Sequence, residues 1–426
     1  MSSAFEGVPQ HWKLSRVDRV ASVNARIGWK ALTAAEYQNE GYAFLSTPNI
    51  KSAHIDFENV NFISEFRYEE SPDLKLTVGD VLLAKDGNTL GIVNIVRDLP
   101  RPATVNGSIA ILRSHNIAPS FLCYVIASDV IQGAISAVKD GMGVPHLFQW
   151  DIKRLPVPVP PRGEQQAIVD FLDRETGRID SAIKVSSLRL ALLEERFETL
   201  LDQKVRMASA QHGAVRLRHI LLSIEQGWSP QCEERPAGPG EWGVMKSGCV
   251  NGGVFDARQH KTLPGDIPPR LEYRLNCGDL LMSRASGSMD LIGSVGIVPE
   301  ISQDLLLCDK VYRLRIDPRR GHIPFVAHVL RSHGVREHIR LGISGGEGMA
   351  NNLPSGVVKD CVIPAAPLDI QESFAKELDE ARGRLAEGRV LLRREIGLLA
   401  ERRRALITAA VTGQVDVTTA RGVRVQ

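Results

Sequence analysis

The chain has 426 residues, of which 43% are hydrophobic and 24% are charged, and its formal net charge at pH 7 is +2. These fractions are typical of a globular protein and exclude a disordered chain, while the length exceeds one ordinary core and predicts two or three folded units. The start of the chain lacks an apolar signal-peptide core and no later stretch approaches membrane-spanning length, so we expect a cytoplasmic protein without membrane segments.

The cysteines and the net charge narrow the function only slightly. Six cysteines are scattered along the chain without a C-x-x-C pair. This spacing favours reduced and mostly buried thiols over zinc ligands or disulfides. A net charge near zero does not decide nucleic-acid binding, because local clusters of lysine and arginine decide it.

A first globular unit with short strands and a helix near residues 120–138 is expected at the start of the chain. Its clearest pattern is LTVGDVLLAKDGNTLGIVNIV, in which a Gly-Asp turn precedes an apolar strand, a polar loop and a second apolar strand. The polar loop carries Lys85, Asn88 and Thr89, residue types that contact phosphates or base edges in nucleic-acid complexes. An ordinary solvated hairpin loop is an equally good interpretation.

A long helix follows the proline-rich stretch RLPVPVPPRGEQQ, because proline is tolerated before a helix and in its first turn but not in its interior. Two heptad registers run along it, and at 1.5 Å per residue it would be roughly 65 Å long. A globular body cannot bury so narrow a stripe along its whole length, so we expect a helix as its partner. The apolar positions of the main register are Leu172, Ile179, Leu193 and Leu200.

A second globular unit repeats the pattern of the first. LNCGDLLMSRASGSMDLIGSVGIV contains the same Gly-Asp turn, apolar strand, polar loop and second strand. Its loop offers Arg284, Ser286 and Ser288 as candidates for nucleic-acid contacts. The two loops share a place in one pattern but differ in side chains.

The second long helix is predicted near the end of the chain, after DCVIPAAPLDIQ. A shift of 206 residues aligns it with the first helix over fifty residues without a gap, for example Pro158 with Pro364 and Gln165 with Gln371. Such a match indicates a duplication, and the duplicate is the natural partner for the first helix. Five leucines fall seven residues apart along it: Leu378, Leu385, Leu392, Leu399 and Leu406.

The sequence therefore predicts an α+β protein in which two similar α/β domains are separated by two long helices that form an intramolecular antiparallel coiled coil. The second helix carries eight arginines and three glutamates between residues 381 and 404. A solvated helix face is the default interpretation of such a run, and we favour protein docking there over direct DNA contact. The predicted parts are residues 1–160, 161–209, 210–366 and 367–426.

Weaker candidates for nucleic-acid contacts lie outside the two loops. Trp29 and Trp228 follow a glycine in each unit, and a buried core tryptophan is the better interpretation of both. Polar residues that could contact a nucleic acid are Lys30, Gln226, Lys246, Gln149 and Asn351.

The order of these parts, the GD-[VL]-L-[LM] strands, the junction PVPPRGEQQ and the terminal ERRRALITAAVTGQVDV resemble the specificity subunit of type I restriction–modification systems. The resemblance covers essentially the whole chain. It implies two target recognition domains, each reading one half of a split site in double-stranded DNA. It also implies that the paired helices act as a ruler and as the docking surface for two modification subunits.

The same resemblance implies a subunit without catalytic activity or cofactors of its own. Methyl transfer from S-adenosylmethionine then belongs to the modification subunits, and cleavage with ATP-driven, Mg-dependent translocation belongs to the restriction subunits. The residues agree, because the chain has no phosphate-cradling G-x-x-x-x-G-K-[ST] motif and no N/D-P-P-Y/F tetrapeptide. His333 and His338 lie on different helix faces, so we expect no metal site there.

Two other classes of function remain open from the residues alone. One is a scaffold whose tandem domains bind protein or peptide on a coiled-coil spacer. The other is an enzyme whose site is built from scattered residues. Sequence-specific DNA binding by the chain would exclude the first, and turnover without any partner would support the second.

Overall fold

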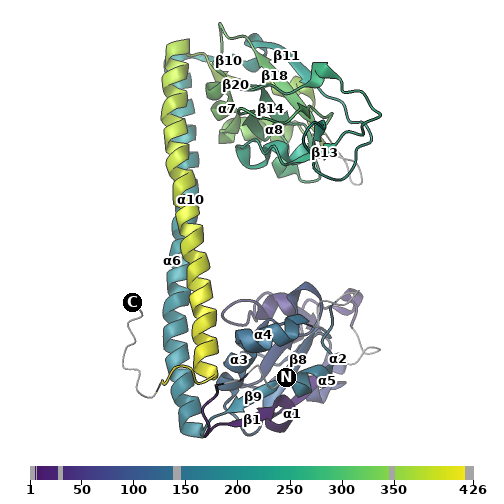
Figure 1. Ribbon diagram of the computed structural model, residues 1–426, viewed down its shortest axis with the longest axis vertical. Helices are drawn as coiled ribbons and strands as arrows, with labels where there is room; N and C mark the ends of the chain where they lie inside the picture. Colours follow the sequence, from purple (N-terminus) through teal and green to yellow (C-terminus); the bar gives the residue numbers. More distant parts are fainter. Residues whose placement is uncertain (1–4, 6, 27–31, 138–144, 345–350, 418–426) are drawn as a thin grey trace. The chain divides into compact units, whose positions relative to one another are not determined.

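The computed structural model describes residues 5, 7–26, 32–137, 145–344 and 351–417. The chain forms two compact units: Met1–Ser187 with Arg393–Gln426, and Leu188–Leu392. Each unit therefore combines one globular domain with a part of both long helices (Figure 1). We refer to them as the first unit and the second unit.

A four-stranded antiparallel sheet forms the centre of the first unit, and a three-stranded sheet and a two-stranded pair accompany it. The four strands lie in the order β2 (Ala21–Ala25), β8 (Ile109–Ser114), β5 (Val81–Ala84) and β6 (Val93–Ile95). The three lie in the order β4 (Asn61–Ile63), β3 (Tyr42–Leu45) and β7 (Ala103–Val105), with β3 and β7 parallel. The pair joins β1 (Lys13–Arg16) and β9 (Pro156–Val159).

The strand β5 shows why this domain has two apolar layers. All four of its residues are buried, and successive side chains of a strand point to opposite faces. Val81 and Leu83 belong to one core cluster, whereas Leu82 and Ala84 belong to another. The helices of the domain are α1 (Val17–Val20), α2 (Glu65–Glu69), α3 (Pro119–Ala127), α4 (Asp129–Ser136) and α5 (Gln149–Arg154).

The second unit has the same sheet topology, which confirms at the level of the fold that the domain is duplicated. Its four-stranded sheet has the order β11 (Leu221–Gln226), β18 (Val311–Ile316), β14 (Leu280–Ser283) and β16 (Val295–Ile297). Its three-stranded sheet has the order β13 (His260–Thr262), β12 (Gly243–Met245) and β17 (Leu305–Leu306). The remaining pairs are β10 (Ala214–Arg216) with β20 (Val362–Pro364), and β15 (Ala285–Ser286) with β19 (Asn351–Asn352).

The helices of the second domain correspond to α3, α4 and α5 of the first. They are α7 (Ile323–Arg331), α8 (His333–Leu341) and α9 (Ser355–Asp360). Short 3-10 turns connect the elements of both domains. These turns are η3 (Ala34–Glu36), η4 (Thr47–Ile50), η5 (Pro72–Leu74), η6 (Gly87–Thr89), η8 (Leu217–His219), η9 (Ser247–Gly253), η10 (Leu271–Tyr273) and η11 (Met289–Leu291).

The two long helices are α6 (Arg162–His212) and α10 (Leu368–Val411), with 51 and 44 residues. Each begins directly after the prolines that the sequence places before it, because proline fits a helix start but not its interior. Each is followed closely by a glycine with a left-handed backbone, Gly213 (φ 78°) and Gly413 (φ 73°). Such a residue ends a helix because only glycine adopts this conformation without a steric cost.

Within each unit, α6 and α10 pair in antiparallel fashion. In the first unit Arg403 Nε lies 2.9 Å from Asp180 Oδ1, and in the second Arg389 Nη2 lies 2.8 Å from Glu194 Oε1. Residue numbers thus fall along one helix as they rise along the other, which confirms the predicted antiparallel coiled coil. Among the seam positions, Leu172, Ile179 and Leu378 are buried, and Leu193, Leu200, Leu385, Leu392, Leu399 and Leu406 are partly buried.

Equivalent hydrogen bonds attach each domain to its helices. In the first unit, Gln165 on α6 accepts from the Ala118 backbone N–H at 2.8 Å, and Tyr124 Oη donates to Asp173 at 2.5 Å. In the second unit Gln371, on α10, accepts from the His322 N–H at 2.8 Å. His328 Nε2 there lies 2.7 Å from Asp379, at the place of the tyrosine. In the first unit Thr408, on α10, caps the start of α4. In the second unit Asp202, on α6, caps the start of α8.

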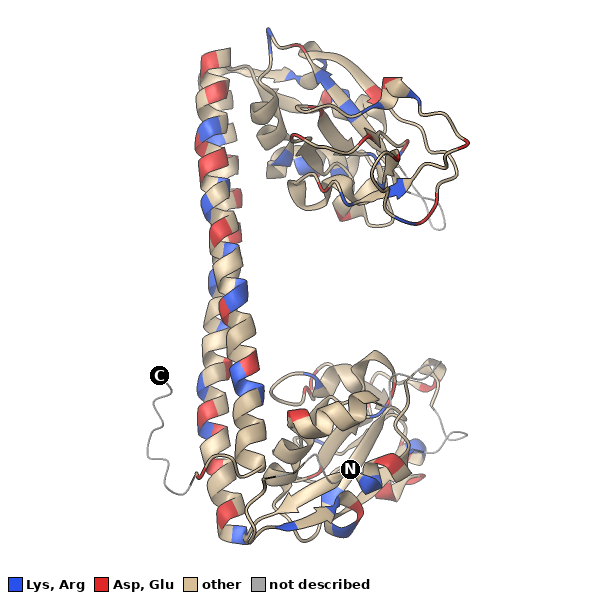
Figure 2. Cartoon of the chain, viewed as in Figure 1, with Lys and Arg blue, Asp and Glu red and all other residues tan. Residues whose placement is uncertain are grey.

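No single described helix is long and apolar enough to cross a membrane, and only the pair α3 and α4, bent by 57°, reaches that length and composition together. Both helices of this pair contribute buried side chains to the core of the first unit. The six cysteines are free thiols, three of them buried. Charges of both signs alternate along α6 and α10 (Figure 2).

Candidate nucleic-acid interface

The loop after β5 lies against a segment that is sixty residues further along the chain. The Gly87 N–H donates to Pro145 O at 2.9 Å, and the Leu147 N–H donates to Lys85 O at 2.8 Å. Two parts of the chain therefore form one surface, residues 85–89 and 145–150, which we call the first polar edge. It brings together four of the predicted contact residues: Lys85, Asn88, Thr89 and Gln149.

The four side chains of the first polar edge differ in how available they are. Asn88 is exposed, and Gln149 donates to Ala25 O at 3.1 Å. Thr89 Oγ1 donates to Asp86 O at 3.0 Å. The Lys85 side chain is only 8% exposed and its ammonium lies 3.2 Å from the Asp86 carboxylate. A phosphate contact by Lys85 would require the ammonium to leave this carboxylate.

Two aromatic residues on this edge were not singled out from the sequence. Phe148 and Trp150 are 53% and 56% exposed, with ring centroids 6.5 Å apart and nearly parallel planes. The Arg154 guanidinium lies 5.2 Å from the Trp150 centroid. Exposed flat rings beside a cation are suited to stacking on bases. The available signal was the polar stretch HLFQWDIK, where large aromatics alternate with polar residues.

The second unit presents the equivalent surface. The Leu353 N–H donates to Arg284 O at 2.9 Å, and β15 pairs with β19 so that Ser286 faces Asn351. We call residues 284–288 and 351–353 the second polar edge. It holds the predicted residues Arg284, Ser286, Ser288 and Asn351. Gln226 ends β11 opposite Tyr312, whose hydroxyl donates to Leu353 O at 2.9 Å, and so it adjoins this edge.

Arg284 is held by neutral acceptors. Its Nε donates to Tyr312 Oη at 3.1 Å and its Nη1 donates to Asp309 O at 3.2 Å. The guanidinium also lies 5.7 Å from the Tyr312 ring centroid. Among the described residues no carboxylate forms an ion pair with it. The positive charge is thus positioned but not neutralised, which suits an anionic or guanine partner.

Two weaker candidates are not brought to these edges. Lys246 follows β12 of the three-stranded sheet, and its ammonium lies 4.0 Å from the Glu234 carboxylate. Lys30 lies outside the described residues. Trp228 packs against a core cluster as a partly buried residue, and the other tryptophan of this pair, Trp29, is also outside the described residues.

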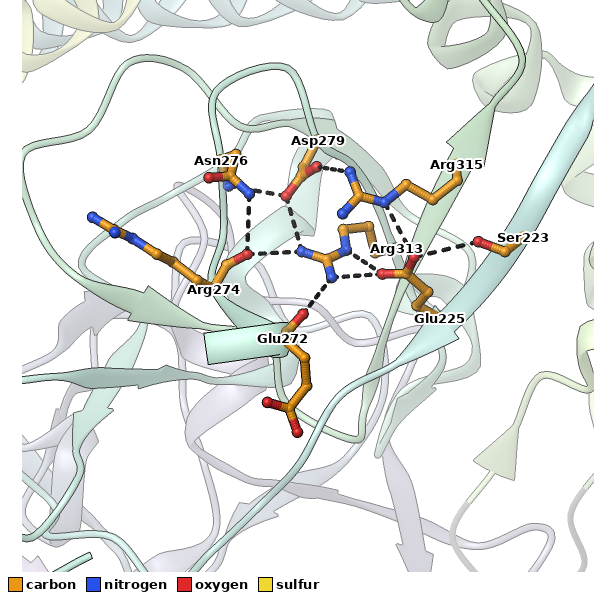
Figure 3. Close-up of polar contacts among 8 residues, drawn as sticks. All are labelled: Ser223, Glu225, Glu272, Arg274, Asn276, Asp279, Arg313 and Arg315. Carbon is orange, nitrogen blue, oxygen red and sulfur yellow. Dashed lines mark hydrogen bonds and ion pairs between the residues drawn. The ribbon is translucent and has the colours of Figure 1, made fainter. Parts of the chain in front are cut away.

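A buried ionic network supports the sheet of the second unit (Figure 3). The Arg313 side chain is 3% exposed and its guanidinium contacts Glu225 Oε2 at 2.5 Å and Asp279 Oδ2 at 3.3 Å. Arg315 contacts the same two carboxylates at 3.2 and 2.9 Å. Burial would raise the pKa of Glu225, but the two arginines outweigh it and the pKa is lowered. This network was not predicted from the sequence.

The first unit replaces most of this network. Asn24 faces Ile111 in the pair β2–β8, just as Glu225 faces Arg313 in the pair β11–β18. The ion pair Asp80–Arg113, at 2.8 Å, is kept. The duplicated domains therefore have the same backbone fold but differ in the polarity of the residues at one buried position of the sheet.

Two copies of one α/β domain, each followed by a long helix that pairs with its duplicate, define an internally duplicated two-domain subunit. Residues 9–184 match the family described as type I restriction modification DNA specificity domain. Beyond these residues the chain is similar to the specificity subunits of type I restriction–modification systems. Specificity subunits of type I restriction–modification systems are non-catalytic. Among the described residues no group of histidine, cysteine and carboxylate side chains is arranged to hold a metal ion.

Individual relatives agree with this assignment. The EcoKI specificity subunit of Escherichia coli K12 is 22% identical over 325 residues, which is 72% of this chain and 69% of that protein. The StySPI specificity subunit of Salmonella potsdam is 21% identical over 395 residues, 88% of this chain and 82% of that one. A similar fold occurs in a solved structure that concerns the complex assembly and conformational transition of a type I restriction–modification system. Its TM-score is 0.68 at 16% identity, covering 96% of this chain and 99% of that chain.

Proposed function

We propose that this chain binds double-stranded DNA and gives a type I restriction–modification complex its sequence specificity. The domain of the first unit would read one half of a bipartite, asymmetric site, and the domain of the second unit would read the other half. The observation that carries the proposal is that two domains of one topology present polar edges at the same place, with different side chains.

The side chains on the two edges suit different bases. Asn88 and Gln149 carry amides, and amides pair with the N6 and N7 atoms of adenine. Arg284 carries a guanidinium fork, which matches O6 and N7 of guanine. Phe148 and Trp150 offer exposed rings for stacking. Two edges that favour different bases would produce an asymmetric recognition sequence.

The paired helices suit the docking of protein partners. In the second unit α6 exposes Leu188 and Leu192, and α10 exposes Val390 and Leu391, each more than half exposed. Apolar side chains exposed along a helix pair are typical of an interaction surface. We propose that two modification subunits dock on these helices and that restriction subunits complete the assembly in the cytoplasm. S-adenosylmethionine, ATP and Mg would be bound by those subunits, and this chain would carry no cofactor.

Methylome sequencing of a host that expresses the chain with its modification subunit tests the proposal. The expected result is methylation at one bipartite motif whose two halves differ in sequence and are separated by a fixed spacer. A host that lacks the chain but retains the modification subunit is the control and should show no such motif. Methylation that is independent of the chain, or a continuous palindromic motif, would contradict the proposal.

A further inference from the structure

Four arginines gather around a pocket that lies wholly within the second unit. The pocket has a volume of about 550 Å³ and is bounded by the turns η9 and η11, by α7 and α8, and by both long helices. Its lining includes Arg331, Arg336, Arg382 and Arg389. A pocket of this size can hold a small molecule.

Three of these arginines donate hydrogen bonds to backbone carbonyls. Arg331 Nη2 donates to Gly253 O at 2.9 Å, and Arg382 donates to the same carbonyl. Arg336 donates to the carbonyls of Ile292 and Asp290, each at 2.7 Å. Among the described residues, no carboxylate forms an ion pair with any of these three guanidiniums.

The acidic residues near the pocket are engaged or exposed. Glu194 is paired with Arg389 at 2.8 Å. Asp379, which lies beside the arginines, is 2.7 Å from His328 Nε2. Glu198 and Asp290 also line the pocket but are exposed to solvent, where water screens their charge. Against the larger effect of burial, Asp379 raises the pKa of Arg331 and Arg382, and Asp290 raises that of Arg336, but among the described residues neither carboxylate forms an ion pair with these guanidiniums.

Burial of these charges is costly. Burial, and the nearby Arg382, lower the pKa of Arg331 to about 9, and burial also lowers the pKa of Arg336 and Arg382. The arginines still carry their charge at neutral pH. A buried charge without an ion-pair partner is unfavourable, and backbone carbonyls offset only part of that cost.

The shared fold does not require these arginines. The first unit has counterparts of α7 and α8, namely α3 and α4, and the same antiparallel pairing, so it shows which residues the fold itself needs. Arg331 ends α7 and Arg336 is the fourth residue of α8. Arg382 and Arg389 lie on α10, whose residues correspond to residues of α6 with numbers lower by 206. The equivalent residues of the first unit carry no positive charge: Ala127, Gln132, Thr176 and Ile183.

We propose that this pocket binds a phosphate group, either as inorganic phosphate or as part of a nucleotide-sized molecule. Guanidinium forks bind phosphate oxygens in pairs, and several arginines converging on one cavity offer the geometry that a tetrahedral oxyanion needs. The site is distinct from the two polar edges. A ligand that binds only the folded second unit also stabilises it.

Calorimetric titration of the full chain with inorganic phosphate and with AMP tests the proposal. We expect saturable binding and a rise in the melting temperature of the second unit with ligand concentration. Equal affinity for both probes would identify the phosphate group itself as the ligand, and tighter binding of AMP would identify a nucleotide. Absence of saturable binding of either probe to the parent chain would overturn the proposal.

Three variants locate the binding. Arg382→Thr introduces the residue of the first unit and should weaken binding about tenfold or more, since a charge-assisted hydrogen bond is lost. Arg384→Thr, at an exposed position of the same helix, is the matched control and should bind like the parent. If the threonine variant does not fold, Arg382→Lys keeps the charge, loses the fork, and should still weaken binding. Equal binding by the Arg382 and Arg384 variants would place the anion elsewhere and refute the site.

Discussion

Replacing Arg313 with isoleucine, the residue that the first unit has at this sheet position, should destabilise the second unit. The side chain is 3% exposed, and its guanidinium also donates to the carbonyls of Arg274 and Glu272, each at 2.8 Å. Removal would leave these carbonyls and two carboxylates without this donor. Loss of one partner from a buried ion pair costs about 3–5 kcal/mol.

The lower end of that range applies here. Arg315 would still contact Glu225 and Asp279, at 3.2 and 2.9 Å, and Glu225 is 34% exposed, so water can solvate it in part. We therefore expect a loss of about 3 kcal/mol. For a unit of this size the melting temperature should fall by about 6–12 °C.

The first unit supplies the compensating change. Arg313→Ile combined with Glu225→Asn reproduces its pair Asn24 and Ile111, and removes one of the two carboxylates that lose their contact with Arg313 in the single variant. Buried ion pairs can be replaced by other well-packed residues at little cost, so the double variant should recover at least half of the loss.

Scanning calorimetry of the parent, both single variants and the double variant measures the coupling between the two positions. The Ile111→Val variant is a control, because it changes the same sheet position of the other unit and should leave the second unit's transition in place. A loss below about 1 kcal/mol for Arg313→Ile, or a double variant less stable than the single one, would refute the reasoning.

Three further predictions concern the polar edges, the helices and pH. Arg284→Ala should weaken binding of the assembled complex to its cognate duplex by about 1–3 kcal/mol and relax one base position. Lys85→Ala should weaken binding to all sequences alike and lower the salt slope by about one unit, as the loss of a phosphate contact does; an unchanged slope would contradict that contact. Leu392→Lys with Leu399→Lys should abolish assembly with the modification subunits or reduce helical circular dichroism, because charge enters the seam; survival of both would contradict the coiled-coil account. Burial lowers the pKa of His328 to about 4, despite its hydrogen-bonded carboxylate, so the unfolded chain binds more protons than the folded chain below pH 6.5. The free energy of unfolding of the second unit should therefore fall by up to about 3 kcal/mol between pH 6.5 and pH 4. A His328→Tyr variant with an equally steep pH dependence in calorimetry would contradict this.

The sequence was sufficient for the architecture because the signals for it are repetitive. The leucines of the second helix and the 206-residue match of Gln165 with Gln371 depend on spacing alone. Both glutamines make the same kind of hydrogen bond to their own domain. A duplicated pattern is seen twice, so its interpretation does not depend on any single residue.

The local environments could not be predicted because distant segments create them. Lys85 looks like a solvated loop residue, but residues 145–149 cover it from sixty positions away. In the strand VYRLRI, alternation suggests that Arg313 and Arg315 share a solvated face. Arg313 is buried because the turn η10 and Glu225 close over that face. In neither case does the residue's own stretch of sequence indicate that its side chain is buried.

Exchange of one domain tests the central claim most directly. Residues 1–150 would be replaced by those of a relative that recognises another sequence, and the methylome of the host would be sequenced with the parent chain as control. We predict that one half of the methylated motif changes while the other half and the spacer are retained. A motif altered in both halves, or in neither, would contradict the assignment of one domain to one half-site.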